Sequence, residues 1–566
     1  MFASLQGYRL PWLRLDLLAG VAVWAVLAPQ ALAYASIAGV SPVVGLYAAT
    51  AGLVLYAAFG SSKHLSVGPM AATAALSAAV VASYAQAGST EFTALTGVLA
   101  IVTGVFALVA GLLRLGFLAN FISEPVLKGF IVGLALNIVI GQAPKFFGVE
   151  GGSGDFFLKV WSLLTNLGHT NWLTFAIGLL SLALVLGLRR FLPVVPGSMV
   201  TVVLGIVAVA VFGLDRHGVA IVGHIEAGLP RVGLPTVKPA DYLQLAPDAV
   251  GVTLVAFVES LGAAKVYAAQ HHYEVSADRE LLALGVANLG AGLAGGMIVN
   301  GSLTKTAVNE SAGARTQASG LAAAALTILT LLFLTPFFAY LPDTTLAAVV
   351  IAAVVQLVDF PGLADLFRIS TRRQGLELGV TARPDFVSAL ASLIGVLVFD
   401  TLPGLFIGIG ISILVLVYRA SRPYVAILGR VPGQEGLFGD VERHPEYEEV
   451  AGITVLRVDG GLFFANADYV RGRIRCVVAA RNPHVVILDG GAMPYIDVTA
   501  VRMLEALTGE LRRDGRELVL TRQLGQVRDV LRKTKPRVSV RTYASLPDAI
   551  KDLDVPAPPA DESDGQ

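Results

Sequence analysis

The stretch GSSKHLSVGPM, residues 60–70, interrupts a strongly apolar sequence with glycines, serines, a proline and a lysine. The small-residue run AATAALSAAVVA follows it directly, at 71–82. A second broken stretch, GGMIVNGSLT at 295–304, stands in the other half of the chain and also leads into a helix-compatible sequence. The meaning of the two breaks depends on whether the segments around them are solvated by water or by lipid.

The composition indicates lipid. Of 566 residues, 55% are hydrophobic and only 14% are charged, whereas soluble domains carry about 25% charged residues. Apolar segments of about 20 residues recur from Leu17 to Tyr418, and each is long enough to cross a hydrocarbon core of ~30 Å as a helix. The sequence therefore predicts a polytopic α-helical membrane protein. Lys plus Arg equals Asp plus Glu, at 41 each, so net charge gives no indication of nucleic-acid binding.

Apolar windows bounded by Gly, Pro or charges predict about 14 membrane spans. They lie near 17–36, 41–59, 68–86, 93–113, 122–142, 171–188, 197–213, 247–266, 280–298, 302–314, 320–340, 344–358, 382–399 and 403–419. The third and tenth windows are the least ordinary, because each follows one of the two broken stretches. The region 1–419 is therefore predicted to be one transmembrane domain.

The distribution of cations predicts the orientation, because short cytoplasmic loops are enriched in Lys and Arg. The cations that fall on alternate bridges are Arg9, Arg14, Lys63, Arg114, Arg189, Arg190, Lys265, Arg315 and the cluster within 368–383. The intervening bridges, including SIAGVSP at 36–42 and GSTE at 88–91, carry almost none. This alternation predicts cytoplasmic N- and C-termini.

An odd number of spans in each half gives halves of opposite orientation, so we expect a 7+7 inverted repeat with 214–246 as the connector. The third and tenth spans then correspond, as half-helices that begin near Pro69 and Ser302. Broken segments at corresponding positions point to a transporter binding site. Two helix N-termini meeting near the midplane would offer unpaired N–H groups and about half a positive charge each to an anion. The alternative is a pair of simple kinks between packed helices.

After Arg419 the sequence becomes charged and alternates strand-like and helix-like segments. This pattern predicts a small α/β domain with a largely parallel sheet. We expect a linker at 420–436, the domain at 437–554 and a disordered, Pro-rich, acidic tail at 555–566. The single cysteine, Cys476, excludes an internal disulfide and fits a reducing, cytosolic location.

Five blocks of the sequence resemble the SulP sulfate-permease family of anion transporters, which carry a C-terminal STAS domain. The blocks are APQALAYASIAGVSPVVGLYAA at 28–49, FGSSKHLSVGP at 59–69, ELLALGVANLGAGLAGG at 280–296, NGSLTKTAVNESAGARTQASG at 300–320 and NPHVVILDGGAMPYIDVTAV at 482–501. They stand in the family's order and cover nearly the whole chain. The resemblance implies a core domain of spans one to four and eight to eleven, a gate domain of the remaining spans, and a homodimer.

The resemblance also implies the substrate-binding residues. Carried over by position, they are Gln30, Tyr34, Met70, Ala71, Ser302, Leu303, Thr304 and Lys305. The family often has Ser-Arg where this chain has Thr304-Lys305, and Lys lacks the bidentate fork of Arg. Met70 stands where the family often has an aromatic residue that could clamp the ligand.

Glu259 is a carboxylate inside the eighth span. Such a residue costs roughly 2.5–3.5 kcal/mol on insertion scales and is by default a functional-site hypothesis with a partner, here Lys305. It is the candidate ion-coupling residue, and a structural Glu–Lys pair is the alternative. Sodium-coupled relatives have a hydroxyl one turn later, where this chain has Ala263, so the resemblance favours a proton over sodium.

Three smaller signals have a structural and a functional interpretation. His271 and His272 with Glu274 resemble metal ligands, but a solvated loop is favoured because no third ligand has suitable spacing. Glu124 and Lys128 are expected to form a local pair one turn apart. Thr499 stands where related STAS domains carry a phosphorylatable Ser, and a helix N-cap is its structural interpretation.

The sequence thus predicts a secondary active transporter for a small oxyanion, with sulfate favoured and proton coupling through Glu259. Bicarbonate and dicarboxylates such as fumarate or succinate stay open as substrates, as do an uncoupled channel or exchanger and a non-transporting scaffold. We expect a multi-pass protein of the cell (inner) membrane that contacts lipids and binds no nucleic acid or cofactor. No nucleotide-binding or nucleophile motif is present in the sequence, which argues against an enzyme.

Overall fold

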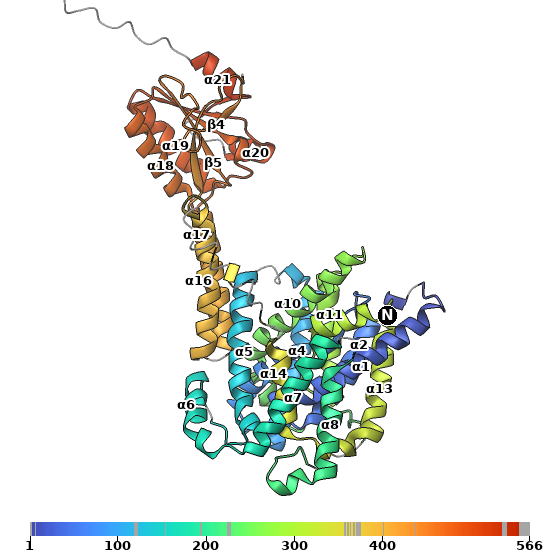
Figure 1. The fold of residues 1–566 in the computed structure, drawn as a ribbon. Helices are drawn as coiled ribbons and strands as arrows, with labels where there is room; N and C mark the ends of the chain where they lie inside the picture. The colour runs from blue at the N-terminus through green and yellow to red at the C-terminus, as the bar shows by residue number, and fades with distance from the viewer. Residues whose placement is uncertain are drawn as a thin grey trace, which may run out of the picture. The chain divides into compact units, whose positions relative to one another are not determined.

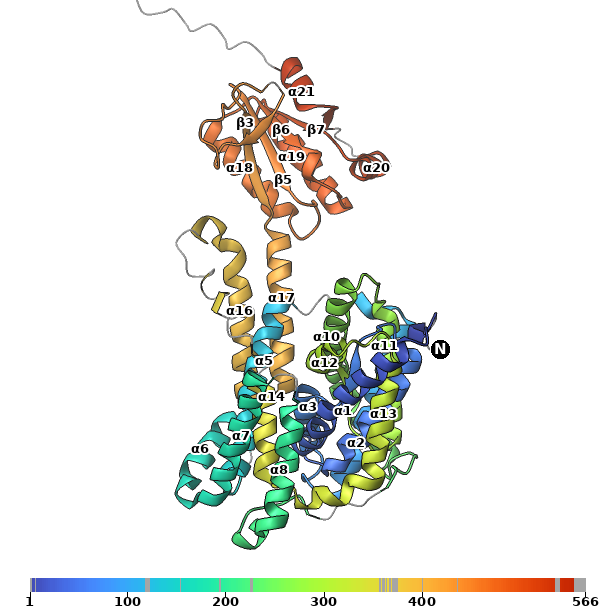
Figure 2. The ribbon, with the colours of Figure 1, turned by 45° about the vertical axis from the view of Figure 1, so that its right-hand side comes forward.

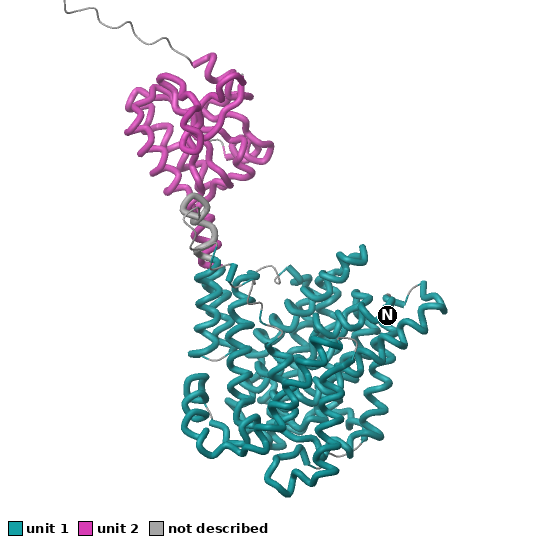
Figure 3. Tube along the Cα trace, in the orientation of Figure 1, with its two compact units in different colours: residues 1–412 teal, residues 413–566 magenta. Residues whose placement is uncertain are grey.

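The computed structural model describes most of the chain. The described residues are 3–5, 7–117, 123–152, 154–192, 195–223, 228–355, 358, 362, 364–365, 368, 375–399, 401–434, 436–534 and 540–553. The predicted tail at 555–566 lies outside them. The chain divides into two compact units, residues 1–412 and 413–566 (Figure 3).

Unit 1 is helical, and each of the predicted span windows contains a helix (Figure 1). The α-helices are α1 Trp12–Ile37, α2 Pro42–Phe59, α3 Ala71–Ala82, α4 Thr90–Leu112, α5 Glu124–Phe147, α6 Phe156–Asn166, α7 Trp172–Phe191, α8 Gly197–Phe212, α9 Pro239–Gln244, α10 Ala246–Gln270, α11 Ala277–Leu293, α12 Leu303–Ser311, α13 Ala318–Leu329, α14 Asp343–Val355, α16 Gly375–Phe399 and α17 Thr401–Ser421. Short helical turns extend α13: a π-turn covers Thr330–Leu334 and a 3-10 turn covers Thr335–Tyr340. The helices α6 and α9 fall between the predicted windows and were not expected.

Eight helices of the described chain are long and apolar enough to cross a membrane. Shorter apolar helices, among them α3, α8 and α14, supplement them. The chain is therefore a helical membrane protein, and the count of about 14 crossings stays a prediction.

Small residues allow the helices of unit 1 to pack closely. A Cβ added at Gly104 of α4 would lie 2.7 Å from the carbonyl oxygen of Gly285 in α11. A Cβ added at Gly45 of α2 would lie 2.0 Å from the carbonyl oxygen of Ala31 in α1. Close backbone approach of this kind is how helices associate where lipid removes most of the hydrophobic driving force.

Two short strands lie within this helical unit. β1, Ser66–Gly68, pairs antiparallel with β2, Asn300–Ser302. Both strands are buried, and their pairing satisfies backbone groups that would otherwise be unpaired in the interior. The strands come from the two broken stretches that the sequence singled out, so segments more than 200 residues apart meet at one place.

Unit 2 is an α/β domain (Figure 2). Its strands are β3 Tyr424–Arg430, β4 Phe438–Asp440, β5 Ile453–Asp459, β6 Val485–Asp489, β7 Glu517–Thr521 and β8 Arg541–Tyr543. The sheet has the order β4-β3-β5-β6-β7-β8, with β5 to β8 parallel and β3 antiparallel to its neighbours. β3 lies in the stretch predicted to be a linker, 420–436.

Helices cover both faces of this sheet. α18 Ala467–Arg481, α19 Val498–Arg513 and α20 Gly525–Thr534 contribute to one hydrophobic core, and α21 Leu546–Leu553 contributes to the other. The central strand β6 reads VVILD and is buried throughout, as expected for a parallel strand covered on both sides. The largely parallel α/β fold predicted from the sequence is confirmed.

Candidate functional site

The β1–β2 pair brings two helix N-termini together. Ser66 lies opposite Ser302 and Gly68 lies opposite Asn300. α3 begins at Ala71, just after β1, and α12 begins at Leu303, just after β2. The first N–H groups of a helix have no intrahelical acceptor, so both strands end where donors are available to an anion.

Polar side chains hold the start of α12. Ser302 is the N-cap, and its Oγ accepts a hydrogen bond from the Lys305 N–H at 3.2 Å and lies 3.1 Å from Thr304 Oγ1. Thr306 Oγ1 accepts from the Ser66 N–H at 3.0 Å and so ties α12 to β1. Gly301 is required here, because a Cβ would lie 2.8 Å from the side chain of Leu65 and 2.9 Å from the Cα of Ser260.

The start of α3 is apolar by contrast. Its N-cap is Met70, which is extended and supplies no side-chain cap. Ala71 and Ala72 follow, and both are buried. The N-cap residue of α3 therefore leaves the first amides of the helix without a side-chain cap.

Lys305 lies between the two helix starts. Its side chain is 1% exposed, and Nζ donates to the Pro69 carbonyl oxygen at 2.7 Å, just before α3. Nζ also lies 5.9 Å from the ring centre of Tyr34 on α1, within cation–π range. No carboxylate forms an ion pair with Lys305 in the described part of the chain. A buried ammonium with neutral partners only is a position at which an anion would be stabilised.

Glu259 has a different partner from the one expected. Its Oε2 accepts from Asn300 Nδ2 at 2.7 Å, and among the described residues it makes no ion pair with Lys305. Asn300 is 0% exposed, and its Oδ1 accepts from Thr73 Oγ1 at 2.9 Å. The predicted Glu259–Lys305 pair is therefore wrong: the neutral Asn300 side chain connects α10 to the first turn of α3 and leaves Lys305 uncompensated.

The predicted residues of α1 and α12 lie around this centre. Gln30 and Tyr34 stand one turn apart, on the same face of α1. Gln30 Oε1 is buried and has no hydrogen-bond partner among the described residues. Leu303, the first residue of α12, is 51% exposed, whereas Met70, the N-cap of α3, is 6% exposed. The exposed Leu303 indicates open space beside the start of α12.

Sequence reasoning missed Asn300, Thr73 and Ser260. Ser260 Oγ accepts from the Gly301 N–H at 2.7 Å and fixes β2 against α10. The signal for Asn300 was its place in the motif NGSLTK, but nothing in the sequence indicates that it faces Glu259. Asn288 on α11 supports the same strand, because its side chain both donates to and accepts from the backbone of Val299 at 2.9 Å.

Buried carboxylates anchor the loops next to the site. Glu280 of α11 is 0% exposed and accepts from Tyr56 Oη at 2.7 Å and from the N–H and Oγ of Ser61 at 2.9 and 2.6 Å. Asp16 of α1 is also 0% exposed and accepts from the Arg315 N–H at 2.7 Å and from Thr316 Oγ1 at 2.7 Å. These contacts fix the segments that enter β1 and leave α12.

The smaller sequence signals have mixed outcomes. Glu124 and Lys128 form the expected pair at 2.8 Å. His271 Nε2 lies 3.1 Å from Glu310 Oε1 and its ring stacks on that of His64 at 4.3 Å. In the described chain no group of three His, Cys, Asp or Glu residues has metal-binding geometry.

The N-cap of α19 is Asp497, whose side chain accepts from the Ala500 N–H, so the N-cap interpretation of Thr499 is wrong. Thr499 is exposed in the first turn instead.

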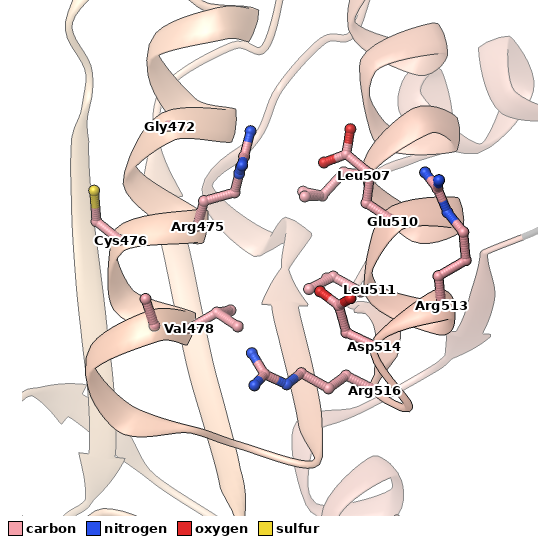
Figure 4. Close-up of a pocket in the computed structure, with 11 residues that line it drawn as sticks. Gly472, Arg475, Cys476, Val478, Leu507, Glu510, Leu511, Arg513, Asp514 and Arg516 are labelled. Carbon is pink, nitrogen blue, oxygen red and sulfur yellow. The ribbon is translucent and has the colours of Figure 1, made fainter.

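Unit 2 has a cavity of its own, of about 800 Å³, between α18 and α19. Arg475 and Arg516 reach toward this space from its two sides, and Asp514 lies beside Arg516 (Figure 4). Glu510 also lines it and is paired with Arg471. Because charges of both signs line the cavity, its charge does not single out one class of ligand.

Family models match most of the chain. A model described as the sulfate permease family matches residues 13–374, and a model of the STAS domain matches residues 444–549. A probable sulfate transporter of Mycobacterium tuberculosis is 37% identical over 530 residues, which cover 93% of this chain and 92% of the relative. The chloroplastic sulfate transporter 4.1 of Arabidopsis thaliana is 32% identical over 90% of this chain and 75% of its own.

Solved structures share the fold. Murine solute carrier 26 family member A9, an anion transporter solved in the inward-facing state, matches with a TM-score of 0.86 and 21% identity over 97% of this chain and 92% of its own. The transmembrane domain of the cyanobacterial bicarbonate transporter BicA matches with a TM-score of 0.58 and 24% identity over 68% of this chain and 97% of its own.

Proposed function

The chain belongs to the sulfate permease family and carries a STAS domain, and we propose from this premise that it is a secondary active transporter that takes up sulfate together with a proton. Transporters rather than enzymes make up the family, which agrees with the absence of catalytic motifs in the sequence. We further propose a homodimer in the cell membrane with both termini in the cytoplasm, as the cation pattern predicts.

Lys305 is the observation that carries this proposal. An ammonium has three N–H donors, and one of them reaches the Pro69 carbonyl oxygen. An isolated buried charge is expensive unless it is paired and hydrogen-bonded. A sulfate ion between the starts of α3 and α12 would accept from the remaining donors of Lys305 and from first-turn backbone N–H groups. The site needs no metal to bind an anion.

The arrangement of the two helices supports a proposal of alternating access. We propose that α3 and α12 are half-helices of an inverted repeat and that α1 to α4 move with α10 to α13 as one core. The β1–β2 pair and the Thr73–Asn300–Glu259 hydrogen bonds keep both helix starts in one body. The remaining long helices, such as α5 and α14, would form the gate against which this body moves.

Glu259 is proposed as the proton site. Its carboxylate is hydrogen-bonded to Asn300, which in turn contacts the first turn of α3. Proton binding there would change the charge next to the anion without breaking an ion pair, because Lys305 is not its partner. This gives a simple route by which anion and proton occupancy are coupled.

Uptake of labelled sulfate, bicarbonate and fumarate into liposomes with an imposed pH or sodium gradient tests this function. We expect sulfate uptake that is accelerated by an inward proton gradient. A preference for bicarbonate or fumarate would replace the substrate, and sodium-driven uptake at constant pH would replace the coupling ion. Anion movement that depends on neither gradient would favour the alternative of an uncoupled channel or exchanger.

A further inference from the structure

A cavity of about 410 Å³ lies in unit 1, apart from the residues of the candidate site. One wall is the alanine face of α3, formed by Ala75, Ala78, Ala79 and Ala82. With a rise of about 1.5 Å per residue, these alanines lie from about 6 Å to about 17 Å beyond Ala71, at which the candidate site begins. The opposite wall comes from α5 and α6, so the cavity separates a proposed core helix, α3, from a proposed gate helix, α5.

The polar groups of the cavity carry positive charge and no negative charge. Lys145 and Lys159 line it together with Asn137 and Gln142, and no carboxylate is among its lining residues. Lys159 Nζ donates to Asn137 Oδ1 at 3.3 Å. Neither lysine forms an ion pair with a described residue. Gln142 is 6% exposed, and its side chain makes no hydrogen bond within the described part of the chain. The buried amide of Gln142 and the ammonium groups of Lys145 and Lys159 can therefore donate hydrogen bonds to a bound anion.

The two lysines differ in how they relate to the helices that carry them. Lys145 lies in the last turn of α5, where a cation is favourable, whereas Lys159 is the fourth residue of α6, near the positive end of that helix, where a cation is disfavoured. The Asp155 carboxylate, one turn before Lys159, caps α6 by accepting from the Leu158 N–H and forms no ion pair with Lys159. The two bridges that line the cavity, at Ser36 to Gly39 and at Ala87, belong to the side that the cation pattern predicts to be external. Cations are scarce on that side, yet two of them meet at this cavity.

We propose that this cavity is an external loading site for an inorganic oxyanion. Lys145 and Lys159 hold the anion electrostatically, and the amide of Gln142 orients it. The alanine face of α3 then provides a path without bulky side chains toward the helix start at Ala71. This inference rests on the proposed function, because it concerns how the substrate reaches the site.

Sided transport kinetics test the loading site. The double variant Lys145→Gln with Lys159→Gln should raise the KM for sulfate about fivefold or more in right-side-out membrane vesicles, as expected for losing about 1 kcal/mol of binding. The maximal rate, and the KM in inverted vesicles, should stay unchanged. Lys238→Gln, which removes an exposed cation from the same predicted side but outside the cavity, is the control. An unchanged external KM, or an equal rise on both sides, would overturn the proposal.

A labelling experiment tests the site without transport. In a Cys476→Ala background, Ala79→Cys places a thiol in the cavity wall, and a membrane-impermeant maleimide should label it from outside. Sulfate should slow that labelling, and the double lysine variant should remove the protection. Protection in a protein that shows no uptake would leave the loading site standing while the proposed function fails. A thiol that never reacts, or reacts at the same rate with sulfate present, would overturn the loading site.

Discussion

The two units treat ionised side chains in opposite ways. In unit 1 the buried charges Asp16, Glu280 and Lys305 are each 1% exposed or less and are held by hydroxyls, amides and backbone groups. Within the described residues none of them belongs to an ion pair. In unit 2 the carboxylates meet arginines directly, as in Arg522–Asp489, Arg471–Glu510 and Arg481–Glu449. The first arrangement keeps charge available inside the protein, and the second neutralises it.

The difference has a functional meaning. In an ion pair each charge already has a partner of opposite sign close by, so neither partner gains much from a third ion. A buried charge surrounded by neutral dipoles is hydrogen-bonded but not neutralised, and it still attracts an ion of opposite sign in a medium of low dielectric constant. Lys305 would serve an anion in this way, and the half-buried Glu259, which is hydrogen-bonded to the neutral Asn300 amide, would serve a proton. The α/β unit, in which Arg and carboxylate side chains compensate one another, has the charge pattern of a stably folded domain.

Reversing the charge of Lys305 should have the largest effect. In Lys305→Glu a carboxylate would occupy the place of the anion and repel it, so we expect sulfate uptake to fall by about 100-fold or more, a loss of about 2.7 kcal/mol. Uptake into liposomes measures this, and size-exclusion chromatography in detergent checks the fold. Lys63→Glu is the matched control, because Lys63 is exposed in the loop before β1. Uptake with an unchanged KM in Lys305→Glu would contradict the site.

Neutralising Glu259 should affect the response to a gradient more than exchange. Gln retains the size of a protonated carboxyl but cannot release a proton, so in Glu259→Gln an inward pH gradient should no longer accelerate uptake. We expect the gradient-driven component to fall about 10-fold, or about 1.4 kcal/mol, with sulfate–sulfate exchange retained. The control is Glu274→Gln, in the exposed loop before α11. A variant that still responds to the pH gradient would show that Glu259 is structural.

The sequence predicts the position of this site better than its internal connections. The two broken stretches were identifiable because Gly, Pro and Ser interrupt apolar runs, and such breaks have a local cause. Which side chain faces Glu259 depends on the β1–β2 register, which places Asn300 opposite Gly68. A one-residue shift of that register would turn every side chain to the other face. The ion pair with Lys305 was expected from charge alone, and charge alone does not fix register.

Two other differences between the sequence predictions and the structure have reasons of their own. The N-cap of α19 is Asp497 rather than Thr499, because either residue type is favourable at that position and the boundary is set by how the helix packs on the sheet. α6 was not predicted because its 11-residue amphipathic sequence, FFLKVWSLLTN, is too short for a membrane span. Helix caps and short amphipathic helices are therefore predicted less well by local sequence patterns than long apolar spans are.

Replacing the buried Glu280 carboxylate, whose hydrogen-bond donors are neutral groups, should lower the stability of the protein. In Glu280→Gln one carboxylate oxygen becomes an NH₂ donor facing other donors, Tyr56 Oη and Ser61. A buried group left unsatisfied costs about 1–3 kcal/mol, so we expect a lower Tm of the detergent-solubilised protein, measured by size-exclusion chromatography after heating. Glu274→Gln, which changes an exposed carboxylate nearby, should leave the Tm unchanged. Equal Tm values for both variants would mean that Glu280 does not anchor the loop.

Removing one member of an ion pair in unit 2 should have the smallest effect. Arg481 contacts Glu449 at 2.7 and 2.8 Å and, by this hydrogen bond, lowers the pKa of Glu449 below its ordinary value of 4.5. A lowered folded-state pKa stabilises the domain above the unfolded-state value, and this contribution is lost as the pH falls through the lowered pKa. Because both side chains are about a third or more exposed, Glu449→Gln should destabilise the isolated domain by less than about 1 kcal/mol at pH 7 and by nothing at low pH. Chemical unfolding followed by circular dichroism measures this, with Asp529→Asn as the control for an exposed carboxylate without an ion pair in the described structure. A loss of well over about 1 kcal/mol at pH 7, beyond what an exposed ion pair contributes, would mean that charges in the two units are not held differently, and the contrast between them would fail.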